Sequence, residues 1–311
     1  MRAAEPPGSR LRYTRPRRQE PATADAFHPS GVHCMSSMPS APVATQTRIV
    51  HPVSTGHALF AATLIGIGLF GLATGRFTPI WDSAPATLPG RAALAYLCAV
   101  VALAGGLGSL LRPTAALAAR VLVVALSLWL VLIKLPYILA EPTVEVHYQS
   151  AGETALVLAC ACVLYGWLAA DRDSRRARVL SPRHCMRTAW LLEALALTAF
   201  GLSHFAYLQF TAPLVPHWLG GGIFWAYLTG SAYLAAAAAL FTGRWARLAS
   251  VLVTAQMGLF TLLVWVPRVL IRRFAGPIGE CVDSWVLTVS AWVLAESLRA
   301  DRRRGSPGSS P

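Results

Sequence analysis

The stretch "FGLSHFAYLQFTAPLVPHWLGGGIFW", residues 200–225, begins in one apolar run and ends in another. Between the ends of the stretch lie a histidine, two prolines, a second histidine and a tryptophan. Apolar runs of about 18–20 residues are long enough to cross a bilayer as helices. The stretch is therefore typical of two membrane-spanning helices joined by a short turn, and His204 lies where the first of them meets water.

The rest of the 311-residue chain repeats this pattern. Hydrophobic residues make up 55% of it and charged residues only 13%, about half the charged fraction usual in soluble domains. The sequence therefore predicts an all-α membrane protein with about eight transmembrane helices in contact with the lipid bilayer. The predicted spans are 57–75, 92–111, 114–139, 151–170, 188–209, 220–241, 248–267 and 281–299.

The net charge of +13 is carried almost entirely by arginine, because Lys134 is the only lysine. The arginines cluster in the N-terminal leader, in the segment "DRDSRRARVLSPRHCMR" at 171–187 and in the C-terminal tail. Basic residues concentrate in cytoplasmic loops. We therefore expect a multi-pass protein of the bacterial cytoplasmic (inner) membrane with both termini inside. We exclude nucleic acid as a partner, because no folded domain outside the membrane is available to present a binding groove.

The composition of the chain separates three polar segments from the two apolar halves: a leader, a linker and a tail. Residues 1–56 are rich in Pro, Arg and Ser and lack an apolar segment, which excludes a secretory signal peptide and predicts disorder. A start codon at Met35 or Met38 is an alternative explanation for this leader. We expect 171–187 to be a cytoplasmic linker and 300–311 to be a disordered basic tail.

The two halves of the apolar region are related by an internal repeat. Three dipeptides recur 130 residues apart: Gly71-Leu72 and Gly201-Leu202, Val121-Leu122 and Val251-Leu252, Asp171-Arg172 and Asp301-Arg302. Each half contains an even number of spans, so both halves have the same orientation in the membrane. The sequence therefore predicts two parallel four-helix repeats, 57–170 and 188–299, arranged as two bundles side by side.

The second repeat has a distinctive set of glycine, histidine, aromatic and proline residues. They are Gly201, His204, Val215, Pro216, Trp218, Trp225, Tyr227, Thr229, Gly230, Pro267 and Arg268. In these residues the repeat resembles the DoxX-like family of small bacterial membrane proteins, clearly over about 190–300 and loosely over 57–170. The family often has a histidine two residues before the proline of the third helix, where this chain has Trp265 and Lys134.

The resemblance implies a four-helix membrane unit and, in some relatives, a subunit of a thiosulfate–quinone oxidoreductase or a partner of a thiol-redox system. It supplies no catalytic residues. The sequence itself has no nucleophile elbow, P-loop, GxGxxG or HExxH motif in a suitable setting, so it gives no positive evidence for an enzyme. We expect an accessory or quinone-contacting subunit of a membrane redox complex. The alternatives are a small-molecule transporter and a ligand-free scaffold. The sequence is compatible with an oligomer as well as a monomer.

Glu193 and His204 are the first site candidates. They lie eleven residues apart, close to three helical turns, and so share one face of the fifth span. Ionisable side chains inside a membrane are functional hypotheses by default. The pair could form a proton path or contact a quinone headgroup, with the "VPHW" loop as an outer lid. The alternative is that Glu193 pairs with Arg187 and that His204 only hydrogen-bonds at the interface.

His217 and Trp218 lie in that outer loop. His204 and His217 together could ligate a haem b, but bis-histidine sites usually draw on facing helices, so we do not expect haem. Trp218 is typical of the interfacial aromatic belt. No cysteine or histidine spacing predicts a metal site.

Lys134 and Arg268 are the remaining candidates, both near the outer surface. Lys134 could snorkel to the interface and pair with Glu141 or Glu145. Arg268 could contact lipid headgroups or an anionic ligand. Two further acidic residues have a structural explanation: Ser150 to Glu153 reads as a capping box at the start of span four, and Asp283 suits the start of span eight.

Overall fold

The computed structural model describes residues 53–169, 181–271 and 277–304. Most of the predicted leader, the linker up to residue 180 and the end of the tail lie outside these ranges. All of the described residues belong to one compact unit. Every regular element described in it is a helix, which confirms the predicted fold class.

Eight of these helices are long and apolar enough to cross a membrane, as predicted. Two of the eight, the third and the seventh, are each interrupted by a five-residue π-helical segment. The chain therefore has the composition and the helix lengths of a multi-pass membrane protein. The spans are α1 (Thr55–Thr74), α2 (Arg91–Leu110), α3 to α4 (Ala115–Ala140), α5 (Glu145–Leu168), α6 (Pro182–Ala206), α8 (Gly222–Thr242), α9 to α10 (Ala246–Ile271) and α11 (Ile278–Arg304).

The fourth, fifth and eighth helices begin earlier than the sequence analysis predicted. The fifth, α6, begins at Pro182, inside the predicted linker 171–187. Residues 145–150, read there as loop because they are polar, form the first turns of α5. The predicted capping box at Ser150 is therefore wrong. Asp283 likewise lies five residues inside α11 and not at its first position. Polar side chains are compatible with these turns because they face a cavity, described below.

The internal repeat is visible in the elements themselves. The third span of the first half consists of α3 (Ala115–Trp129), a π segment (Leu130–Lys134) and α4 (Leu135–Ala140). In the second half, α9 (Ala246–Phe260), a π segment (Thr261–Trp265) and α10 (Val266–Ile271) each begin 131 residues later. In both spans a proline follows the π segment at the second position of the next helix. Proline cannot donate a helical hydrogen bond, and the π segment accommodates that break.

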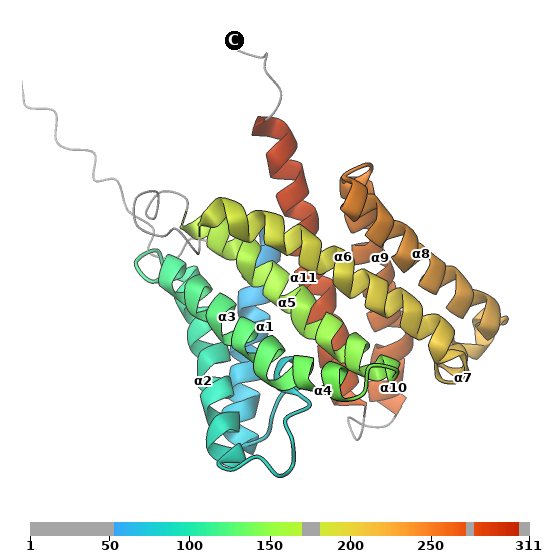
Figure 1. Ribbon diagram of the computed structural model, residues 1–311, viewed down its shortest axis with the longest axis horizontal. Coiled ribbons are helices and arrows are strands. Elements are labelled where there is room, and N and C mark those ends of the chain that lie inside the picture. Colours follow the sequence, from blue (N-terminus) through green and yellow to red (C-terminus); the bar gives the residue numbers. More distant parts are fainter. Residues whose placement is uncertain (1–52, 170–180, 272–276, 305–311) are drawn as a thin grey trace, which may run out of the picture. The chain divides into compact units, whose positions relative to one another are not determined.

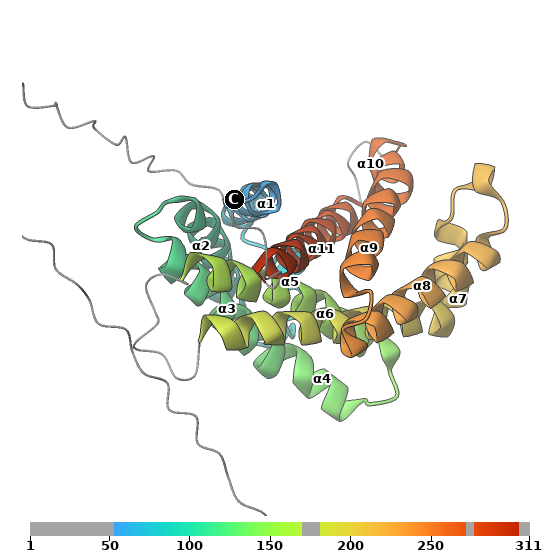
Figure 2. The same cartoon turned by 90° about the horizontal axis from the view of Figure 1, so that it is seen from above.

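The two repeats interlock and do not stand side by side as separate bundles. Within each half, consecutive spans pack in order along the chain. Across the halves, α1 packs against α11 and α6 packs extensively against α5, while α5 and α11 contact each other in the middle (Figures 1 and 2). The first helix of each half thus packs on the fourth helix of the other half. Accordingly, every residue of α5 from 154 to 166 is buried.

Small residues allow the first two helices of each half to approach closely. A Cβ atom added to Gly68 of α1 would lie 2.6 Å from the backbone nitrogen of Leu103 in α2. A Cβ added to Gly230 of α8 would lie 2.7 Å from the Cβ of His204 in α6. Such contacts are typical of helix association in lipid, where no hydrophobic force between helices is available.

Candidate functional site

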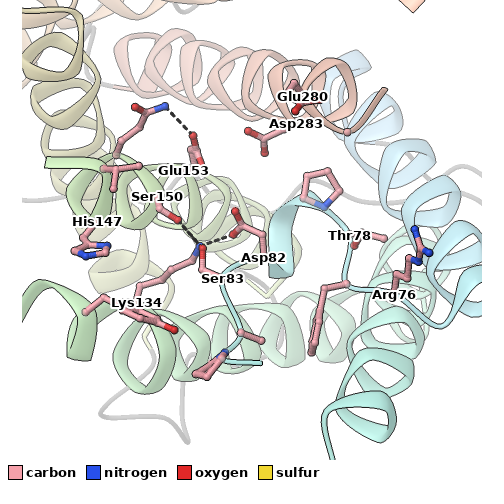
Figure 3. Close-up of a pocket in the computed structure, with 18 of the residues that line it drawn as sticks. Arg76, Thr78, Asp82, Ser83, Lys134, His147, Ser150, Glu153, Glu280 and Asp283 are labelled. Carbon is pink, nitrogen blue, oxygen red and sulfur yellow. Dashed lines mark hydrogen bonds and ion pairs between the residues drawn. The ribbon is translucent and has the colours of Figure 1, made fainter. Parts of the chain in front are cut away.

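A cavity of about 830 Å³ opens between the two halves, at the end of the molecule where α5 and α11 begin (Figure 3). Its walls come from the segment that links α1 to α2, from the π segment of the third span, and from the first turns of α5 and α11. These first turns are the polar stretches that the sequence analysis read as loop. The cavity is therefore lined by charged and polar side chains at the junction of the repeats.

Lys134 is the most buried charged residue of this cavity, with 2% of its surface exposed. Its ammonium group forms an ion pair with Asp82 and donates hydrogen bonds to the hydroxyl oxygens of Ser150 at 2.6 Å and Ser83 at 3.1 Å (Figure 3). An ammonium group has three N–H donors, so these partners use all of them. Lys134 therefore does not snorkel to the interface.

The partner of Lys134 is not one of the two carboxylates suggested by the sequence. Glu141 bonds the Nε2 of His147 at 2.9 Å, and Glu145 accepts a hydrogen bond from Ser203. Asp82 comes instead from the segment between α1 and α2, which folds back against the start of α5. No sequence signal near Lys134 indicates this contact, because the two residues are 52 positions apart.

Aromatic packing holds Asp82 in place. The preceding residue, Trp81, ends a short 3-10 turn (Pro79–Trp81) and is 2% exposed. Its ring meets the ring of Trp129 edge to face, with 5.4 Å between centroids. The following residue, Ser83, has a φ of 64°, a left-handed conformation that is unusual for a residue with a side chain. The backbone around Asp82 is thus fixed on both sides, which orients the carboxylate towards Lys134.

Two further carboxylates face the cavity from equivalent positions of the repeat. Glu153 on α5 and Asp283 on α11 are 130 residues apart, the spacing of the repeated dipeptides. Both side chains project into the space between the two helices (Figure 3). Glu153 accepts a hydrogen bond from the amide nitrogen of Gln149 at 3.3 Å. The repeat spacing was the available signal for this pair, which the sequence analysis interpreted as two separate helix starts.

The lining is acidic overall. Among the described residues, the cavity is lined by four carboxylates but by only two side chains with a permanent positive charge, Arg76 and Lys134. Lys134 is already paired with Asp82. Glu280 lies one turn before Asp283 on α11 and adds to the negative charge. The described lining therefore has more carboxyl groups than basic side chains.

A second, smaller cavity of about 230 Å³ adjoins the first and contains His204. The two cavities share Gln149, Glu153, Glu280 and Asp283, so they meet at the carboxylates. The Nδ1 atom of His204 lies 2.7 Å from the carbonyl oxygen of Phe200. Because a carbonyl oxygen can only accept, Nδ1 carries the hydrogen and donates it. In the neutral ring this leaves Nε2 as the acceptor.

Aromatic rings form much of the second cavity. The ring of His204 lies 5.4 Å from that of Tyr233 in α8, and the side chains of Phe200, Phe260 and Trp265 complete the aromatic part of the lining. This cavity has the size of a single small ring system, with polar side chains such as Ser203 and Thr211 beside the aromatic rings.

Glu193 lines neither cavity. It is fully buried and accepts a hydrogen bond from the hydroxyl of Ser250 in α9 at 2.8 Å. It shares a helix face with His204, but three turns separate the two residues by about 16 Å along the axis. The structure therefore places Glu193 and His204 in different parts of the molecule. The hydrogen-bond partner of Glu193 is Ser250 and not Arg187, the partner suggested by the sequence.

The remaining candidates lie at the surface. His217 and Trp218 are in a short turn (His217–Leu219), are exposed, and line neither cavity, whereas Leu214 of the same loop lines the smaller one. Arg268 donates hydrogen bonds to the carbonyl oxygens of Pro213, Leu214 and Val264, each at 3.2 Å. Arg268 thereby ties the segment just before the "VPHW" loop to α10.

Within the described ranges, no three His, Cys, Asp or Glu side chains are arranged to hold a metal ion, and the five cysteines there are free. In comparisons with known proteins, no protein-family model, no curated protein and no solved structure matches the chain.

Proposed function

We propose that the protein is a membrane carrier that binds a small organic cation in the larger cavity. The observation that carries this proposal is the pair of carboxylates, Glu153 and Asp283, that face one cavity from equivalent positions of two repeats. Transporters with internal repeats place their substrate sites at the repeat interface. Ionisable residues inside membrane spans mark substrate or ion pathways in such proteins.

The chemistry of the lining favours a cation. Lys134 and Asp82 neutralise each other, which leaves the acidic side chains of α5 and α11 to attract positive charge. A primary or quaternary ammonium ion would make charge-assisted contacts with Glu153 and Asp283. Phe77 and Tyr137, which also line the cavity, offer aromatic faces to such an ion.

The helix interruptions beside the cavity agree with this proposal. Lys134 is the last residue of one π segment, and Trp265, at the end of the equivalent segment, lines the adjoining cavity. Such segments occur frequently at functional sites, and broken helices are usual near transporter binding sites. The arginine distribution supports an inner-membrane protein with both termini inside, in which case the cavity opens outward.

A second candidate function is favoured by the smaller cavity. An accessory subunit of DoxX-like type that contacts a quinone would use His204, whose ring lies among aromatic side chains in a space that fits one headgroup. Glu153 and Asp283, which adjoin this space, would then exchange protons with the quinone. The resemblance of residues 190–300 to DoxX-like proteins supports this alternative, although Glu193 is not part of the site. A scaffold without ligand is the third alternative.

A ligand screen on the detergent-purified protein tests these alternatives together. Thermal unfolding is followed with a panel of small primary amines and quaternary ammonium ions, and a solvent extract is analysed for quinones. The carrier proposal expects at least one cation to raise the unfolding temperature, because a ligand that binds only the folded state stabilises it. Co-purified quinone that is lost in His204→Ala, without any response to cations, would favour the redox subunit. A protein without either response would be a scaffold.

A further inference from the structure

A third hollow lies apart from both cavities. It is a groove of about 620 Å³ between the third span, α5 and α6, and its lining is almost entirely apolar. The deep part is made of small residues, among them Gly152 and Ala155 of α5 and Ala196 of α6, all buried. The rim is made of exposed aliphatic side chains such as Leu135 and Leu195, which are 40% and 50% exposed.

The small residues explain why this groove exists. A Cβ atom added to Gly152 would lie 3.3 Å from the Cβ of Ala199, so α5 and α6 are in close contact at this level. Ala151 and Thr198 are next to this contact on the two helices and leave space above it. In a membrane-spanning protein, an exposed apolar groove of this kind faces hydrocarbon chains.

One end of the groove is polar and acidic. Among the described residues that line it, Glu145 is the only one with a carboxyl group, and none has a basic side chain. One of its carboxylate oxygens accepts a hydrogen bond from Ser203, while the other, Oε2, is buried without a hydrogen-bond partner in the described part of the chain. A buried acceptor without a donor is destabilising, because it has lost its hydrogen bonds to water and gained none in return. This end of the groove therefore lacks a hydrogen-bond donor.

We propose that the groove binds an acyl chain of a phospholipid whose head group carries a primary amine, as in phosphatidylethanolamine. Glu145 is the first residue of α5, at the helix end where lipid head groups lie. A primary ammonium group brings three N–H donors to the unpaired oxygen of Glu145. A purely anionic head group would instead place negative charge beside this carboxylate, with no described cation in the lining to offset it. This inference is independent of the cation proposed for the larger cavity.

Native mass spectrometry of the protein released from vesicles of equal phosphatidylethanolamine and phosphatidylglycerol content tests the proposal. The wild-type protein should retain phosphatidylethanolamine in preference, by about tenfold, the ratio that corresponds to one charge-assisted contact. Glu145→Gln keeps the side-chain shape and the bond to Ser203 but removes the charge. It should lose the preference and still retain lipid.

Filling the groove tests the position of the chain. Ala151→Leu and Thr198→Leu each add bulk to the lining and should reduce retention of both lipids. Ala238→Leu is the matched control, because Ala238 is an exposed alanine of α8 that does not line the groove. Thermal unfolding shows which groove variants are folded, and only the lipid retention of folded variants is compared with that of the control. Equal retention of the two lipids by the wild-type protein, or unchanged retention in a folded groove variant, would overturn the proposal.

Discussion

At the scale of single residues, Lys134 and Asp82 determine how the segment between α1 and α2 is held against the rest of the protein. The ammonium group is almost completely buried, with a side chain 1% exposed, whereas the Asp82 side chain is 46% exposed. Loss of the Asp82 carboxylate should therefore destabilise the protein more than loss of the Lys134 ammonium group. Removing the carboxylate leaves a charge inside the protein, while removing the lysine leaves a carboxylate that water can reach.

This asymmetry gives the first prediction. Asp82→Asn should lower the free energy of unfolding by about 3–5 kcal/mol, the usual cost of an unpaired buried charge. Lys134→Met should cost less, about 1 kcal/mol or below, because solvent compensates the remaining carboxylate. Denaturant unfolding in detergent measures both values. The double variant should be more stable than Asp82→Asn alone, and equal losses in the two single variants would contradict this account.

The same residues show how far the sequence could predict the site. Lys134 was a site candidate from its position in an apolar run, whereas Glu153 and Asp283 were interpreted as helix starts and not as site residues. Their grouping in one cavity was not predicted, because Asp82 reaches Lys134 from a segment far away in the chain. Glu193 and His204 share a helix face, as predicted. A shared face does not place two residues at the same depth, and that is why they do not share a cavity.

At the scale of elements, glycines decide how closely α1 and α2 approach each other. Gly66 and Gly68 lie two residues apart on α1 and face different surroundings. A Cβ at Gly68 would meet the backbone of α2, with Leu103 N at 2.6 Å and Ala99 O at 2.8 Å, whereas nothing lies within 4 Å of a Cβ at Gly66. Backbone atoms cannot move aside as the end of a side chain can.

The second prediction follows from this contrast. Gly68→Ala should force the two helices apart and destabilise the protein by about 1–3 kcal/mol, the range typical of overpacking. Gly66→Ala should be neutral or stabilising by up to about 1 kcal/mol, because alanine favours helix. Thermal unfolding of the two variants side by side provides the measurement. A destabilised Gly66→Ala variant, or a Gly68→Ala variant as stable as the wild type, would show that the helix contact is described incorrectly.

Helix boundaries were predicted well where apolar residues continue to the end of a span, and poorly where a helix begins with polar residues, as α5 and α6 do. The start of α5 is the clearest case. His147, Gln149 and Ser150 look like loop in sequence, but backbone hydrogen bonds continue through them and their side chains point to a polar interior. The π segments were not predicted, because the apolar composition of these spans does not distinguish them from regular helix; Pro136 and Pro267 each stand two residues after one of them.

At the scale of the whole molecule, the repeat predicts the number and direction of the helices but not their partners. The same apolar pattern is compatible with two arrangements. The four helices of one half can form a separate bundle, or they can pack against helices of the other half. In the structure α1 packs on α11 and α6 on α5, so each half is completed by the other. The central position of α5 and α11 is also what brings Glu153 and Asp283 to one cavity.

Interlocking gives the third prediction. The two halves, residues 47–175 and 176–311, should each be unstable when produced alone, because the apolar faces of α5 and α6 lose their main partner. Produced together, they should associate and be recovered as one complex. Size-exclusion chromatography in detergent distinguishes these outcomes. Two halves that are separately folded and monodisperse would instead support independent bundles.

The central claim is that Asp283 and Glu153 bind a small cation, and the most direct measurement is isothermal titration of the purified protein with the most stabilising cation of the screen. Asp283→Asn should weaken binding at least about tenfold, the effect of losing one charge-assisted contact. Glu193→Gln removes a buried carboxylate that lines neither cavity and should leave the affinity unchanged. Unchanged affinity in a folded Asp283→Asn variant, or loss of binding in Glu193→Gln alone, would contradict the account.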